Sequence, residues 1–86
     1  MFTVYVLRSE KTGRRYIGCT ENLDRRLIEH HSGQTKSTRG RGPWKLVHSE
    51  TFPTRADAVA RERALKSGQG RAWLDQLEAQ LRKASA

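Results

Sequence analysis

Residues 14–33 constrain the fold most, because they carry in succession the signals of a strand, a glycine turn and a capped helix. Tyr16 and Ile17 are typical of a pleated strand. Gly18 would let the chain leave that strand at an angle that a side chain resists. Asn22 is a preferred N-cap, and the glycine that closes the stretch is a preferred helix stop. The sequence therefore predicts a strand, a turn at Gly18 and a helix over residues 23–31.

This helix is expected to carry polar groups beside its apolar face. Leu23, Leu27 and His30 fall on one side by their spacing, and Arg26 lies at the edge of the same arc. An arginine and a histidine would then lie close to the strand that carries Tyr16, which is an unusual place to hold a cation. The helix residues expected to point away from this arc are Arg25 and Glu29.

Length and charge narrow the class of protein. The chain has 86 residues, which predicts a single domain over residues 1–86 with a modest core. Its 17 Lys and Arg residues exceed its 9 Asp and Glu residues, giving a net charge of +8. This surplus favours nucleic acid as a partner and an anionic membrane surface as the second candidate. No apolar run approaches the ~20 residues that span a bilayer. The lack of a secretory leader and the single Cys19 favour a reducing cytoplasm.

The remaining elements predict an α+β fold with a small, mainly antiparallel sheet of three strands flanked by helices. Residues 2–7 and 14–17 are predicted to form a hairpin, and residues 44–51 the third strand. Thr54 to Asp57 resembles a capping box at the start of a second helix. Glycines at 68 and 70 are expected to break that helix before a last amphipathic one. The register that would decide whether the two strand tyrosines share a face stays open.

Glu62 is the most informative residue outside the opening stretch. It falls in the middle of the apolar arc of the second helix, where a carboxylate is costly unless a positive group meets it. One interpretation is an ion pair with Arg26 or Lys66. The other is a ligand for a divalent metal, since oxygen ligands with retained waters suit Mg²⁺. A zinc site is not expected, because one cysteine and three histidines give no closed ligand spacing.

Several of these residues together resemble the GIY-YIG nuclease family, and in particular its small single-domain bacterial members. The likeness lies in Thr3-Val4-Tyr5, in Tyr16-Ile17-Gly18, and in Arg26 and His30, and it extends over about residues 2–66. The second half of the motif is the specific part. In the first half, Thr3 stands where the family has glycine, and Val4 stands where it has isoleucine.

The resemblance implies an endonuclease that hydrolyses phosphodiester bonds of nucleic acid, with DNA expected, assisted by one Mg²⁺ or Mn²⁺ ion. It implies that Glu62 holds the metal and that Tyr5 or Tyr16 orients or deprotonates the attacking water. Arg26 would stabilise the phosphate charge, since a guanidinium can meet two phosphate oxygens at once. His30 would support a tyrosine through a hydrogen bond or cap the end of its helix.

Two alternatives remain beside the nuclease. The first is a nucleic-acid-binding module of the same fold that does not cut, because a basic loop explains binding as well as cleavage does. The second is an adaptor that docks a protein partner through the apolar face of the last helix. The cations expected to contact nucleic acid are Lys36, Arg39, Arg41 and Lys66. The residues of the candidate docking face are Trp73, Leu77 and Leu81.

Overall fold

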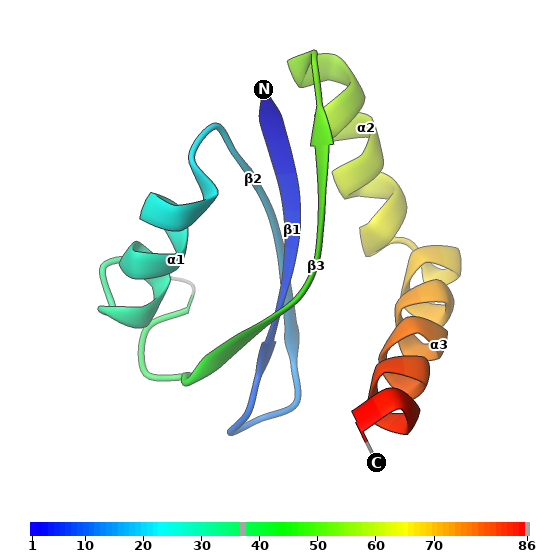
Figure 1. The fold of residues 1–86 in the computed structure, drawn as a ribbon. Helices are drawn as coiled ribbons and strands as arrows, with labels where there is room; N and C mark the ends of the chain where they lie inside the picture. Colours follow the sequence, from blue (N-terminus) through cyan, green and yellow to red (C-terminus); the bar gives the residue numbers. More distant parts are fainter. Residues whose placement is uncertain (37, 86) are drawn as a thin grey trace.

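The computed structural model describes residues 1–36 and 38–85 and shows an α+β fold, as the sequence predicts. A three-stranded antiparallel sheet has the strand order β2-β1-β3. Helix α1 covers one face of this sheet, and α2 and α3 cover the other (Figure 1). None of the helices among the described residues is both long and apolar enough to cross a membrane. The elements are β1 (Phe2–Ser9), β2 (Arg15–Thr20), α1 (Leu23–His31), β3 (Trp44–Phe52), α2 (Arg55–Lys66) and α3 (Gly68–Ser85).

The central strand β1 divides the core into two clusters, because alternate side chains of a strand point to opposite faces. Val4 and Val6 are fully buried and pack against the α2 and α3 side. Tyr5 and Leu7 are buried on the other face, together with Trp44. The first cluster is completed by three helix residues, Ala58, Leu65 and Leu74. The residues packed on the second cluster are Tyr16 of β2 and Leu23 and Leu27 of α1.

The predicted turn at Gly18 is wrong, because β2 continues through this residue to Thr20. Gly18 pairs with Tyr5 of β1, so it is needed for cross-strand packing and not for a change of direction. The chain turns later, where the backbone N–H of Asn22 donates to the Thr20 hydroxyl at 3.1 Å. The strand predicted over residues 14–17 is accordingly shorter than β2.

The predicted helix caps are confirmed. The side chain of Asn22 accepts a hydrogen bond from the Arg25 N–H at 3.1 Å at the start of α1. Thr54 accepts from the Asp57 N–H at 3.2 Å at the start of α2. Gly33 follows α1 with a φ of 78°, a conformation that favours glycine at the end of a helix.

The predicted break between the last two helices lies one position earlier than expected. Ser67 is extended and separates α2 from α3, whereas Gly68 and Gly70 belong to the first turn of α3. The hydroxyl of Ser67 accepts from the Gly70 N–H at 3.2 Å, as a helix cap does. A side chain at Gly70 would collide with the backbone of Leu65, so this glycine allows α3 to begin against the end of α2.

Candidate active site

Two tyrosines and a histidine form an aromatic cluster on the α1 face of the sheet. Tyr16 pairs with Leu7 while Tyr5 pairs with Gly18, so the tyrosines lie diagonally on neighbouring strands and share one face. Their ring centroids are 6.2 Å apart. The imidazole of His30 lies 5.7 Å from the Tyr5 ring and 4.9 Å from the Tyr16 ring. The question of face that the sequence left open is therefore decided by the register.

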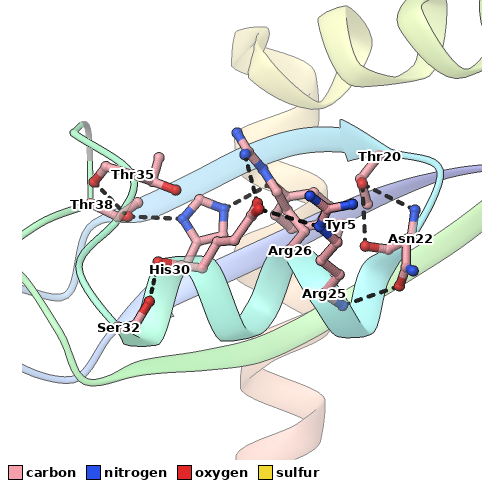
Figure 2. A network of polar contacts seen from close by, with 10 residues as sticks. Tyr5, Thr20, Asn22, Arg25, Arg26, His30, Ser32, Thr35 and Thr38 are labelled. Carbon is pink, nitrogen blue, oxygen red and sulfur yellow. Dashed lines mark hydrogen bonds and ion pairs between the residues drawn. The ribbon is translucent and has the colours of Figure 1, made fainter.

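A chain of hydrogen bonds begins at the Tyr5 hydroxyl and runs through His30 into the loop that follows α1 (Figure 2). The Tyr5 oxygen lies 2.9 Å from Nε2 of His30, and Nε of Arg26 donates to the same oxygen at 3.4 Å. Nδ1 of His30 lies 2.8 Å from the Thr38 hydroxyl. That hydroxyl donates onward to the carbonyl of Thr35 at 3.3 Å. His30 and Thr38 are both buried.

These contacts assign the tautomer of His30. The Thr38 hydroxyl has a single proton, which it donates to Thr35, so it must accept from a protonated Nδ1. Nε2 of the neutral imidazole is then an acceptor, and the Tyr5 hydroxyl donates to it. The Tyr5 oxygen still accepts from Arg26. Each hydrogen bond of the chain therefore has a defined donor and a defined acceptor.

The pKa shifts agree with this assignment. Burial raises the pKa of Tyr5, and the hydrogen bond from Arg26 opposes that rise in part. Burial lowers the pKa of His30 below its usual 6.5, and the positive charge of Arg26 lowers it further. At neutral pH the hydroxyl is consequently protonated and the imidazole is neutral. Both shifts oppose transfer of the Tyr5 proton to His30 while the site holds no further positive charge.

Arg26 is oriented from two sides. Besides its contact with Tyr5, its Nη1 donates to Oε1 of Glu29 at 3.0 Å. The pKa of Arg26 is raised, first by the hydrogen bond with Tyr5 and then by the one with Glu29. The expectation that Glu29 points away from the site is thus wrong, because its carboxylate turns back to hold the guanidinium. The side chain of Arg26 remains 36% exposed, which leaves it accessible to a ligand.

Glu62 comes from the opposite face of the sheet and pairs with Lys66. Oε2 of Glu62 lies 2.7 Å from Nζ of Lys66, one helical turn further along α2. Of the two ion pairs that the sequence suggested, the one with Lys66 forms and the one with Arg26 does not. The Glu62 charge nevertheless reaches the site. Burial raises the pKa of both Tyr5 and Cys19, and the negative charge of Glu62 adds to that rise.

The donor groups fit a hydrated divalent ion better than a closed metal cage. Within residues 1–36 and 38–85, no three His, Cys, Asp or Glu side chains gather around one point. Glu62 is a single carboxylate whose side chain is 22% exposed. Mg²⁺ keeps several waters and is often held by only one or two protein carboxylates, whereas zinc needs three or four ligands. The arrangement suits Mg²⁺ or Mn²⁺.

The basic loop after α1 is held in place by hydrogen bonds to its backbone. The indole N–H of Trp44 donates to the Thr38 carbonyl at 3.1 Å, and Nε of Arg39 donates to the Gly33 carbonyl at 2.8 Å. Lys36 and the two arginines of the loop are exposed. Sequence reasoning missed Thr38, since no spacing links it to His30. The one signal in the sequence is the glycine at position 33, whose left-handed conformation lets the chain turn back towards His30.

The other histidines and the last helix have structural contacts. Nε2 of His31 lies 2.9 Å from the Trp44 carbonyl, and Nε2 of His48 lies 2.7 Å from the Glu50 carboxylate. The ring of Trp73 in α3 packs edge-on against His48 at 5.1 Å. The face suggested for docking a protein is therefore partly covered within the chain, although Trp73 stays 40% exposed.

Comparison with known proteins gives the family. The family model described as the GIY-YIG catalytic domain matches residues 1–83. The chain belongs to this family.

Its relatives are UPF0213 proteins. One from Haloquadratum walsbyi is 49% identical over 53 residues, which are 60% of this chain and 60% of the relative. One from Natronomonas pharaonis is 47% identical over 53 residues, which are 60% of this chain and 62% of the relative. In both cases the chain spans less than two thirds of the relative's own length.

A solved structure supports the fold. The solution NMR structure of a UPF0213 protein from Bacillus halodurans is similar to this one with a TM-score of 0.55 and 38% sequence identity. The similarity covers 90% of this chain and 85% of that one. The three-stranded sheet with its helices is therefore common to both proteins.

Proposed function

We propose that this protein is an endonuclease that hydrolyses phosphodiester bonds of nucleic acid, with DNA as the first candidate, and that it uses one divalent metal ion. One observation carries the proposal. The Tyr5 hydroxyl meets a neutral acceptor, His30, and a permanent cation, Arg26, at the same oxygen. Arg26 favours the Tyr5 anion, and a divalent ion at Glu62 would add the positive charge needed to overcome the opposing effect of burial. Membership of the GIY-YIG family is consistent with this chemistry.

In this proposal Tyr5 is the base. Its proton moves to Nε2 of His30, and the phenolate then takes a proton from the attacking water. Tyr5 is favoured over Tyr16 because it is the tyrosine bonded to His30. Tyr16 lies against both rings and helps to position the water and the substrate. The hydroxide formed attacks phosphorus as the bond to the leaving oxygen breaks.

Arg26 stabilises the phosphate in the transition state. Its guanidinium is half-buried on the inner side, where it contacts Tyr5, and 36% of its side chain is exposed on the outer side. Negative charge builds on the phosphate oxygens as the water attacks, and a fixed guanidinium stabilises that charge without having to rearrange. The contact with Glu29 fixes the guanidinium before the substrate arrives.

Glu62 would hold the metal ion, and Lys66 would then be released from its ion pair to contact the substrate. A divalent ion bound there supplies Lewis acidity to the phosphate group. Since Lys66 is exposed, its separation from Glu62 costs little, because such pairs contribute only about 0–1 kcal/mol. Lys36, Arg39 and Arg41 would hold the phosphate backbone from the loop after α1.

A non-cleaving nucleic-acid-binding module is the second candidate. The ion pair between Glu62 and Lys66 favours it, because that pair gives the carboxylate a purely structural partner. The two candidates differ in two respects: the binder needs no metal, and it leaves its substrate intact.

The test is incubation of the protein with labelled single-stranded, duplex and branched DNA and RNA, in Mg²⁺, in Mn²⁺ and in EDTA. We expect cleavage that requires the metal and is abolished by Glu62→Gln, which keeps the shape of the side chain but removes its charge. Glu10→Gln, which neutralises an exposed carboxylate on the hairpin, is the matched control and should cut at the parental rate. Binding without cleavage under every condition would support the second candidate. Equal cleavage by parent and Glu62→Gln would remove the metal role.

A further inference from the structure

A groove on the far side of β2 is separate from the basic loop and contains a second group of cations. It has a volume of about 760 Å³ and lies between the free edge of β2 and the junction of α2 with α3. Its positively charged lining residues are Arg14, Arg15, Lys66 and Arg71, and none of its lining residues in the described part of the chain is acidic. A concave surface lined by charges of one sign concentrates oppositely charged ligands.

Two of these four cations have an acidic partner among the described residues, and two do not. Arg15 bonds to Glu78 at 3.0 Å and to Asp75 at 2.6 Å, and Lys66 is paired with Glu62. By contrast, the guanidinium groups of Arg14 and Arg71 are exposed and form no ion pair with any described residue. They come from different elements, the end of the β1–β2 hairpin and the first part of α3, yet both line this groove. The fold thus brings two unpaired arginines to one surface.

The groove and the candidate active site share one residue, Tyr16. This residue lines the groove and also lies 4.9 Å from the His30 ring, measured between centroids. Lys66 lines the same groove and is bonded to Glu62, the candidate metal ligand. A strand that lies in the groove would therefore pass Tyr16 and the partner of Glu62.

The walls and the floor of the groove fit a sugar–phosphate backbone. The lining combines guanidinium groups, which can bond two phosphate oxygens, with the apolar side chains of Ile17, Leu65 and Leu74. A nucleic-acid backbone likewise combines charged phosphates with less polar sugars. A flat anionic membrane would meet a convex surface better than this concave one. The groove also exceeds what a single phosphate ion would fill.

We infer that this groove is a second phosphate-binding track, in which Arg14 and Arg71 hold the backbone of the nucleic acid on the side of Tyr16 opposite the loop. The inference rests on the proposed function, since it assumes a nucleic-acid substrate. The helices α2 and α3, which contribute to the lining of the track, lie on the face of the sheet opposite α1 (Figure 1). The substrate would cross the free edge of β2, where Tyr16 is located, and be held on both sides of the bond that is cut.

The experiment measures binding of a fluorescein-labelled DNA duplex as a function of salt, in EDTA so that no metal-dependent cleavage occurs. The double variant Arg14→Ala/Arg71→Ala should reduce the slope of log K against log salt by about 1.8, since each phosphate contact on duplex DNA contributes about 0.9. The control is Lys45→Ala/Lys83→Ala, which also removes two exposed positive charges but outside the groove, and should leave the slope near the parental value. Arg14→Lys/Arg71→Lys keeps the charge and should keep most of the slope.

The outcomes separate this inference from the proposed function. If the parent binds the duplex, and both the Arg14/Arg71 variant and the control keep the parental slope, the track is wrong and the proposed function stands. If the two double variants lose the same amount of slope, net charge explains the result and the track is again wrong. If the parent binds no nucleic acid but binds anionic vesicles through Arg14 and Arg71, both proposals fail together.

Discussion

The Tyr5 hydroxyl occupies the space that a side chain at Gly18 would fill. A Cβ built on Gly18 would lie 2.6 Å from the Tyr5 oxygen and 2.7 Å from Cζ of its ring. The same Cβ would lie 3.1 Å from Cε1 of Tyr16. The glycine therefore allows both tyrosines to lie side by side above β2 while the strand continues beneath them.

Gly18→Ala should displace Tyr5 and so disrupt the site without removing any polar group. We expect a loss of stability of about 1–3 kcal/mol from overpacking, together with a fall in cleavage rate because the bond from Tyr5 to His30 is stretched. Thermal unfolding and single-turnover cleavage are the measurements. Gly68→Ala is the control, since a Cβ there has no neighbour within 4 Å, and it should leave both quantities close to parental. A parental cleavage rate in Gly18→Ala would show that the position of Tyr5 is unimportant.

Arg26→Lys should impair cleavage nearly as much as Arg26→Ala, while binding of the uncut substrate falls much less. An ammonium keeps the charge but cannot bond Tyr5, Glu29 and a phosphate at once, as the guanidinium fork can. Removing one such stabilising group costs about 2–4 kcal/mol in the chemical step. Single-turnover rates and binding constants, measured on variants shown by circular dichroism to be folded, separate the two effects. Full activity in Arg26→Lys would show that Arg26 contributes only its positive charge to cleavage.

Thr38→Val, a change in the loop after α1, should disturb the tautomer of His30 and lower the cleavage rate. It removes the acceptor for Nδ1 of His30 and leaves that buried N–H unpaired, at a cost of about 1–3 kcal/mol. We expect a loss of rate smaller than the ~10²–10⁴-fold that general acid–base catalysis contributes in total, because His30 remains but is no longer held in one tautomer. The nitrogen chemical shifts of the imidazole report the tautomer directly. Thr38→Ser keeps the hydroxyl and should restore both the tautomer and the rate; if it does not, the effect of valine is one of packing.

The lowered pKa of His30 predicts how stability and activity change with pH. The unfolded chain binds a proton to this histidine near pH 6.5, whereas the folded chain resists it because of burial and the charge of Arg26. The free energy of unfolding should therefore be highest above pH 6.5 and decrease as the pH falls towards the folded pKa. Cleavage should fall over the same range, because a protonated imidazole cannot accept the Tyr5 proton.

Urea unfolding and cleavage measured from neutral to mildly acidic pH test this prediction. In His30→Gln the acidic decrease in stability should be smaller, whereas in His31→Gln, which leaves the buried imidazole intact, it should persist. An NMR titration of His30 with a midpoint at or above 6.5 would contradict the lowered pKa.

Much of the local structure follows from the sequence, because its causes are local. Asn22 and Thr54 cap helices through bonds to residues three positions away, and the spacing of Leu23, Leu27 and His30 selects the buried side of α1. The unbroken apolar run from Val4 to Leu7 likewise predicts a strand buried on both faces. These signals were enough for the α+β fold, whereas the roles of the candidate site residues came from the resemblance to the GIY-YIG family.

The tertiary structure decided what depends on distant pairs. The antiparallel register set Gly18 opposite Tyr5, which turned a predicted turn into part of a strand and brought both tyrosines to one face. The return of the loop brought Thr38 to His30, and the meeting of hairpin and α3 brought Arg14 and Arg71 to one groove. No local pattern records such contacts, because they arise only when the burial of both faces of β1 fixes the register and the positions of the helices at the same time.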